Sequence, residues 1–210
     1  GHFVAAEIIN QLKDDKDNPW LLFEKALDNP KGILSDVVAA LIPFNSNKLY
    51  KRLKEKSTPT RIKFLHLLSR FDLSIEQATF LFVAEEREAL GIIRKDEEYL
   101  LNPYLIYEDL RFTTTPVALS TIDLGLYLKN PSDNLLPDQL VYDDPFEIHR
   151  IRAITIQQLE YAALQGHTLL PRKEIIKQIR ELSLSPTCAI NSDYYELAEE
   201  CFTGSIVLEE

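Results

Sequence analysis

Seven basic residues lie between positions 48 and 63, where the only carboxylate is Glu55. They are Lys48, Lys51, Arg52, Lys54, Lys56, Arg61 and Lys63. Clustered cations of this kind contact nucleic-acid phosphates and release the counterions bound there. The same spacing also fits a solvated helix face, because Leu49, Tyr50 and Leu53 lie between the lysines. The stretch therefore predicts either a phosphate-contacting surface or a plain amphipathic helix.

A smaller basic group follows Pro171, where Arg172 and Lys173 begin a predicted helix that also carries Lys177 and Arg180. Glu174 and Glu181 offset part of its charge. The candidate nucleic-acid contacts are accordingly Lys48, Lys51, Arg52, Lys54, Arg61, Lys63, Arg172 and Lys173. The whole chain has a net charge of −10, which weighs against strong autonomous binding unless these cations gather on one face.

Catalytic motifs are absent from the sequence. It contains no glycine-rich phosphate loop ending in Lys-Ser or Lys-Thr, no Gly-x-Ser-x-Gly and no His-Glu-x-x-His. Cys188 and Cys201 have no histidine partner at zinc-ligand spacing, so we expect free thiols and no metal site. His167 follows a predicted helix stop, where a structural role at the turn is the more common one. We expect no cofactor to bind this stretch of chain.

The elements that must position the basic residues read as helices throughout. Helix starts recur as a capping residue followed by proline, at Asn18-Pro19, Thr58-Pro59, Asn102-Pro103, Thr115-Pro116 and Asp144-Pro145. Between them, apolar residues recur at three- and four-residue spacing. The predicted helices of the first half span residues 3–13, 19–27, 33–42 and 60–71, and another runs from a capping box at Ser74 to Leu90. This pattern predicts an all-α protein.

A pair of helices dominates the last third of the chain. Asp144 and Pro145 predict the start of a long helix, which Gly166 ends by taking a left-handed conformation. A second helix is predicted from Pro171 to Leu182, a third begins at Asp193, and residues 203–208 read as a short strand. Helix, helix, helix and strand is the order of a winged-helix-like module. As a DNA regulator, such a module needs a basic recognition helix.

The same region resembles a known family. The pattern Asp-Asp-Pro-x-x-Ile-x-Arg at residues 143–150 is followed by Gly-His-Thr-x-Leu-Pro-x-x-Glu-Ile-Ile at residues 166–176. Together they are similar to the segment just ahead of the motor in RecD-like DNA helicases, the family of the exodeoxyribonuclease V alpha subunit. A second similarity joins residues 101–104 with Tyr-Glu-Asp-Leu at residues 107–110, which resemble the link between that family's two helix-hairpin-helix elements.

The resemblance implies two helix-hairpin-helix elements in the middle of the chain. Such hairpins use glycines so that backbone N–H groups approach a phosphate closely. Here the first turn, residues 70–74, and the second turn, residues 112–116, contain no glycine. We therefore expect degenerate hairpins, which keep the helical shape without the phosphate chemistry, or plain helix pairs of the core.

These observations predict three regions: an N-terminal helical segment at 1–57, a helix-hairpin-helix-like region at 58–130 and a winged-helix-like module at 143–210. The resemblance implies a non-catalytic N-terminal module of an ATP-dependent helicase of DNA repair and recombination. Its partners would be single-stranded or forked DNA and the motor domains that follow, where ATP and magnesium would bind. We expect a cytoplasmic location and no membrane contact.

A protein-interaction scaffold that docks onto a motor or partner without touching DNA is the alternative. The acidic total favours it, as do tyrosines expected to be exposed at positions 99, 104, 107, 194 and 195.

Overall fold

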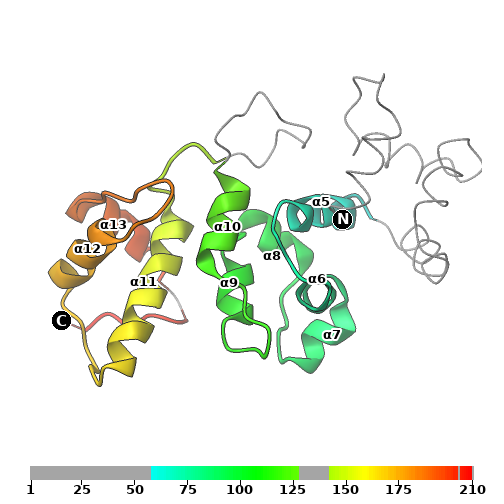
Figure 1. Ribbon diagram of the computed structural model, residues 1–210, viewed down its shortest axis with the longest axis horizontal. Helices are drawn as coiled ribbons and strands as arrows, with labels where there is room; N and C mark the ends of the chain where they lie inside the picture. Colours follow the sequence, from blue (N-terminus) through cyan, green and yellow to red (C-terminus); the bar gives the residue numbers. More distant parts are fainter. Residues whose placement is uncertain (1–57, 128–141, 203, 210) are drawn as a thin grey trace, which may run out of the picture. The chain divides into compact units, whose positions relative to one another are not determined.

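The computed structural model describes residues 58–127, 142–202 and 204–209 of the chain (Figure 1). The chain divides into two units. The described part of the first unit is residues 58–70, and the described part of the second comprises the remaining ranges. The helices predicted within residues 1–57, and Lys48, Lys51, Arg52 and Lys54 with them, lie outside the described residues.

Every regular element among the described residues is a helix, which confirms the all-α prediction for this part of the chain. The helices are α5 Pro59–Ser69, α6 Ile75–Phe82, α7 Ala84–Ala89, α8 Asp96–Leu101, α9 Leu105–Leu110, α10 Leu119–Leu126, α11 Ile148–Leu164, α12 Arg172–Glu181 and α13 Ser192–Glu199. None of them is long and apolar enough to cross a membrane.

Local signals set the start of α5 in the first unit. The hydroxyl of Thr58 accepts a hydrogen bond from the Arg61 amide at 3.2 Å, and Pro59 occupies the first helical position. Phe64, Leu67 and Leu68 are buried. The helix ends at Ser69, slightly before the predicted end at Phe71.

The helix predicted from Ser74 to Leu90 is two helices. Its capping box is confirmed, because the Gln77 amide donates to the Ser74 hydroxyl at 3.1 Å and the Ser74 amide to the Gln77 side chain at 2.8 Å. Val83, however, is extended and separates α6 from α7. The break leaves the Leu81 carbonyl without a helical partner, and the buried Arg87 donates to it at 2.7 Å. Apolar periodicity does not predict this polar contact, although it spans only six residues.

The long helix α11 begins later than predicted. Asp144 caps a turn, accepting from the Phe146 amide at 2.8 Å, and Glu147 caps the helix by accepting from the Arg150 amide at 2.8 Å. The predicted end is confirmed: Gly166 has a φ of 89°. The His167 amide donates to the Ala162 carbonyl at 3.0 Å, which completes the turn.

Helix α11 is the centre of the C-terminal part of the second unit, where it packs against α9, α12 and α13 (Figure 1). The predicted apolar stripe is largely confirmed, with Ile151, Ile154, Ile156 and Ala162 buried, although Ala163 is exposed. Burial of these side chains stabilises the helix through tertiary contact, which supplies most of the stability of helices in proteins.

A fully buried arginine joins α11 to the preceding helices. Arg150 forms an ion pair with Asp123 of α10, with distances of 3.1 Å from Nε and 2.7 Å from Nη2. Its other donations go to the carbonyls of Pro145 at 2.8 Å and Pro186 at 2.6 Å. The Tyr104 hydroxyl donates to the same Asp123 carboxylate at 2.8 Å. Each buried polar group named here thus has a partner, as burial requires.

Four of the five tyrosines that were expected to be exposed are buried. Tyr99 and Tyr104 have no exposed surface, Tyr107 and Tyr195 are also buried, and only Tyr194 is exposed, at 40%. The buried hydroxyls were not anticipated because their carboxylate partners are distant in sequence. Tyr99 donates to Asp109 at 2.8 Å, for example, and Tyr107 donates to Glu160 of α11 at 3.3 Å.

The finer predictions for the C-terminal region are not confirmed. The described residues contain no strand; of the segment 203–208 where one was expected, residues 204–205 form a turn and residues 206–208 have irregular backbone. Three packed helices, α11, α12 and α13, remain as the observed core of this region.

We predict that Asp123→Asn lowers the free energy of unfolding by about 3–5 kcal/mol, because it leaves the buried Arg150 charge without a counter-charge. Replacing both members, as Asp123→Leu with Arg150→Met, is expected to cost less than either single change. Urea unfolding of the 210-residue chain measures these differences.

The control is Arg172→Ala, which removes an ion pair whose arginine side chain is 49% exposed. Its expected cost is about 0–1 kcal/mol. An Asp123→Asn variant no less stable than this control would contradict the importance given to the buried pair.

Candidate functional site

The structure describes four of the eight predicted nucleic-acid contacts. Arg61 and Lys63 lie on α5 in the first unit, and Arg172 and Lys173 begin α12 in the second. Lys63 and both α12 residues are exposed, and Arg61 is half-buried. The α5 residues belong to the first unit and the α12 residues to the second.

Helix α12 has two faces of opposite character. Ile175, Ile176 and Ile179 are buried and hold the helix against its neighbours. Lys173, Lys177 and Arg180 are exposed, and their spacing of four and three residues places them on one face of the helix. The strong contrast between the faces comes from the sequence pattern itself, and packing of the isoleucines fixes which face meets solvent.

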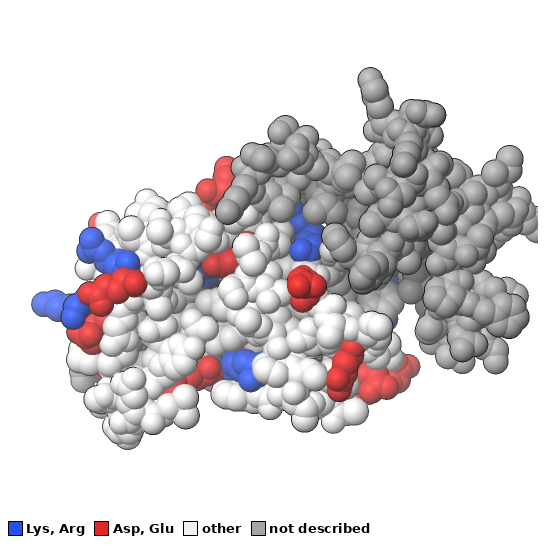
Figure 2. All heavy atoms as spheres, in the orientation of Figure 1, with Lys and Arg blue, Asp and Glu red and all other residues white. Residues whose placement is uncertain are grey.

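Carboxylates offset part of the positive charge of this basic row, which consists of Lys173, Lys177 and Arg180. Arg172 forms an ion pair with Glu199 of α13 at 2.7 Å, and Lys177 lies 3.9 Å from Glu174. Four basic residues against two acidic ones still leave α12 with a formal charge of +2. Figure 2 shows the resulting mixture of basic and acidic side chains over this end of the second unit. Lys173 and Arg180 therefore offer the least neutralised charges for an anionic ligand.

The arginines of α11 cannot serve such a ligand. Arg152 is buried and pairs with both oxygens of Glu108, at 2.8 and 2.9 Å, and Arg150 is buried with Asp123. His149 is half-buried beside Glu147, with 2.6 Å between Nδ1 and Oε1. Position on the helix did not reveal this, because both carboxylate partners come from distant helices.

The turn between α9 and α10 does not present a phosphate cradle. The Thr113 hydroxyl donates to the Leu110 carbonyl at 2.7 Å, so it is engaged within the chain. Gln77 of α6 donates to the Pro116 carbonyl at 2.8 Å and ties the turn to α6. The turn contains no glycine, so its backbone N–H groups cannot easily be approached closely by a phosphate.

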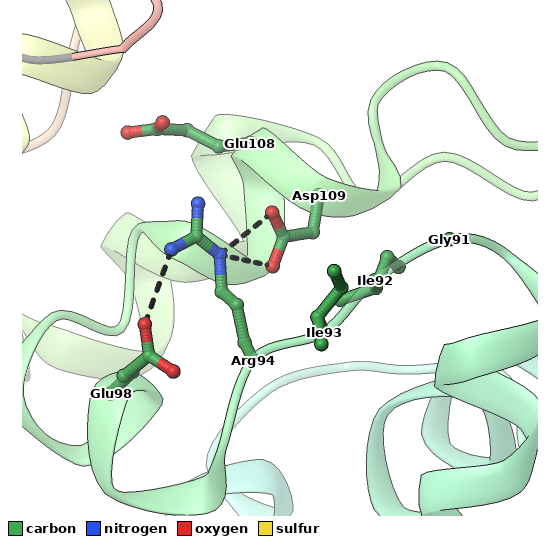
Figure 3. A pocket seen from close by; sticks show the side chains of 7 residues that line it. All are labelled: Gly91, Ile92, Ile93, Arg94, Glu98, Glu108 and Asp109. Atoms are coloured by element: carbon green, nitrogen blue, oxygen red, sulfur yellow. Dashed lines mark hydrogen bonds and ion pairs between the residues drawn. The ribbon is translucent and has the colours of Figure 1, made fainter.

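A hollow of about 430 Å³ opens beside α8 and α9 (Figure 3). It is lined by Gly91, Ile92, Ile93, Arg94, Glu98, Glu108 and Asp109. Figure 3 shows Arg94 held between two of these carboxylates: its Nε donates to both oxygens of Asp109, at 2.9 and 2.7 Å, and Nη1 lies 3.5 Å from Glu98. Local spacing does not predict the Arg94–Asp109 pair, because its members are 15 residues apart.

The charged side chains that line the hollow form ion pairs with partners inside the protein. Burial by itself would lower the pKa of Arg94, but the hydrogen bond and negative charge of Asp109 outweigh it, and the pKa is raised. Burial, followed by the charge of Asp109, likewise raises the pKa of Tyr99. Glu108, on the hollow's wall, is engaged by Arg152. The lining residues thus stabilise one another and include no nucleophile or histidine.

Comparisons with protein-family models, with curated proteins and with solved structures found nothing that matches this chain. Within the described ranges, no group of three or more histidine, cysteine, aspartate or glutamate side chains is arranged to hold a metal ion.

The two cysteines are free thiols in surroundings that suppress reactivity. Cys188 is buried, and burial raises its pKa to about 11, with the nearby Arg150 charge acting in the opposite direction. Cys201 is only partly buried, and burial raises its pKa as well. Because the thiolate is the nucleophile, neither residue is suited to nucleophilic catalysis near neutral pH.

We predict that Cys188 is alkylated more slowly than Cys201 in the folded chain at pH 8. The single-thiol variants Cys201→Ala and Cys188→Ala isolate the two reactions, and iodoacetamide labelling followed by mass spectrometry gives the rates. The Cys188 rate should rise with pH up to about pH 11, as its thiolate forms.

Unfolding in urea serves as the control, since it should bring the two rates together by exposing both thiols. Equal rates in the folded chain would contradict the buried environment of Cys188.

Proposed function

We propose that this chain is a non-catalytic helical module of an ATP-dependent, RecD-like DNA helicase, and that it guides DNA strands in repair and recombination. The observation that carries the proposal is the exposed basic row of α12. Lys173 and the row's packing residues Ile175 and Ile176 lie within residues 166–176, the segment that resembles that family. We propose a cytoplasmic location for the protein.

Physical reasons support phosphate contact by this row. Lys173, Lys177 and Arg180 reach solvent from a helix whose other face is anchored by buried isoleucines, so the charges occupy defined positions. Lysine and arginine contacts to phosphates give binding that is largely independent of sequence and sensitive to salt. A strand-guiding role needs this kind of binding, because the module must hold DNA of any sequence as it moves.

The finer architecture belongs to the same proposal. We propose that α11, α12 and α13 are the helices of a winged-helix-like module, and that residues 203–208 become its strand only on pairing with a strand elsewhere, since residues 206–208 are irregular here. Helices α9 and α10 would then be the second, degenerate hairpin. ATP and magnesium would act only in motor domains beyond this chain, and single-stranded or forked DNA would be the substrate.

A protein-interaction scaffold is the second candidate function. Leu164, at the end of α11, is 84% exposed, and Leu169, in the following turn, is 63% exposed. Exposed apolar side chains mark contact surfaces when they form a contiguous patch, and we propose that Leu164 and Leu169 contribute to one at this helix end. A stable complex with a purified RecD-like motor, insensitive to added DNA, would favour this candidate.

We predict that the chain binds fluorescently labelled forked or single-stranded DNA, and that binding weakens steeply with salt. Lys173→Glu should weaken binding about tenfold at low salt and reduce the slope of log K against log[salt] by about 0.7 to 0.9, since one phosphate contact is lost. Fluorescence anisotropy at two or more salt concentrations measures both quantities.

Lys95→Glu is the matched control, because it makes the same charge change at an exposed residue of the second unit outside α12. Its expected effect is less than about twofold. Equal weakening by both variants, or no DNA binding at low salt, would remove α12 from the proposal and leave the scaffold role.

A further inference from the structure

Helix α13 exposes a face that combines carboxylates with a large apolar side chain. Asp193, Glu196, Leu197 and Glu200 follow one another at spacings that place them on one side of the helix. All four are exposed, and Leu197 retains 56% of its surface. The opposite side, with Tyr195 and Ala198, is buried, so packing fixes the direction of the exposed face.

The three carboxylates of this face are not neutralised by the described part of the chain. None of them takes part in an ion pair among the residues that the structure describes, whereas Glu199, on the flank of α13, is paired with Arg172. Helix α13 itself contains no lysine or arginine. The face therefore combines a negative field with an apolar centre.

A stacked aromatic pair extends the apolar part of this surface. The ring of Tyr194 lies 4.6 Å from that of Phe146, at an interplanar angle of 26°. Phe146 belongs to the turn before α11, where Asp143 and Asp144 are exposed. Aromatic rings attract cations over their faces, and neighbouring carboxylates strengthen that attraction. The pair therefore adds a second feature suited to a positively charged, partly apolar ligand.

We propose that the exposed face of α13, together with the Phe146–Tyr194 pair, binds a basic amphipathic segment of a partner protein. An apolar side chain of the partner covers Leu197, and its lysines or arginines pair with Asp193, Glu196 and Glu200. Charge complementarity selects this occupant over nucleic acid, because phosphates are repelled by the same carboxylates. The inference rests on the scaffold function proposed above and names its surface and the chemistry of its partner.

The test uses the complete chain and a synthetic helical peptide with leucines on one face and lysines on both flanks. Fluorescence anisotropy should give saturable binding that weakens with salt. The combined variant Glu196→Gln, Leu197→Ala and Glu200→Gln should raise Kd at least about tenfold, because it removes the apolar anchor and two charge pairs. Circular dichroism checks that the variant keeps its helices.

A matched variant on another helix separates a defined site from general attraction. Glu86→Gln, Glu88→Gln and Leu90→Ala make the same changes at exposed positions of α7 and its end, where Leu90 is 40% exposed. This control should change Kd less than about twofold. Equal effects of the two variants, or no saturable peptide binding, would overturn the proposal.

The outcome is distinguishable from failure of the DNA-guiding function. Lys173→Glu on α12 should leave peptide affinity within about twofold, and the α13 variant should not weaken DNA binding. Loss of DNA binding with peptide binding intact would therefore reject only the DNA role. An α13 variant that loses both activities would show that the two surfaces are not separate and would overturn the inference.

Discussion

Burial of the Arg150 guanidinium is the constraint on which the packing of the second unit depends. A charge without solvent contact must be matched by hydrogen bonds in every direction, and here Asp123, Pro145 and Pro186 supply them from three separate segments. Tyr104 completes the group by donating to the Asp123 carboxylate. Helices α10 and α11 and the loop before α13 are therefore held in one register, since a shift of any of them would leave a charge unpaired.

The same solution recurs through the second unit. Arg152 pairs with Glu108, Arg87 with Asp96 and Arg94 with Asp109, in each case with a distance below 3 Å. These pairs have a functional consequence. The paired arginines are not available to contact phosphates, although composition alone would count them. The basic character of the described surface of the second unit therefore comes mainly from α12.

Adjacent helices then carry opposite charge. Helix α12 offers a basic row, whereas α13 offers carboxylates around an exposed leucine, and the Arg172–Glu199 pair joins their flanks. If the two proposals hold, α12 would contact DNA and α13 a basic protein segment, and the acidic face would repel phosphates.

The sequence by itself determined the all-α class, the capping box at Ser74, the helix end at Gly166 and the amphipathic character of α12, because these follow from local backbone preferences and periodicity. Only the tertiary structure decided that Arg150 and four tyrosines are buried, and which groups they contact, because their partners are distant in the chain. It also decided the break at Val83, next to which Arg87 donates a hydrogen bond to the Leu81 carbonyl. Local spacing specifies which faces are apolar, but which polar groups meet inside depends on how the helices pack.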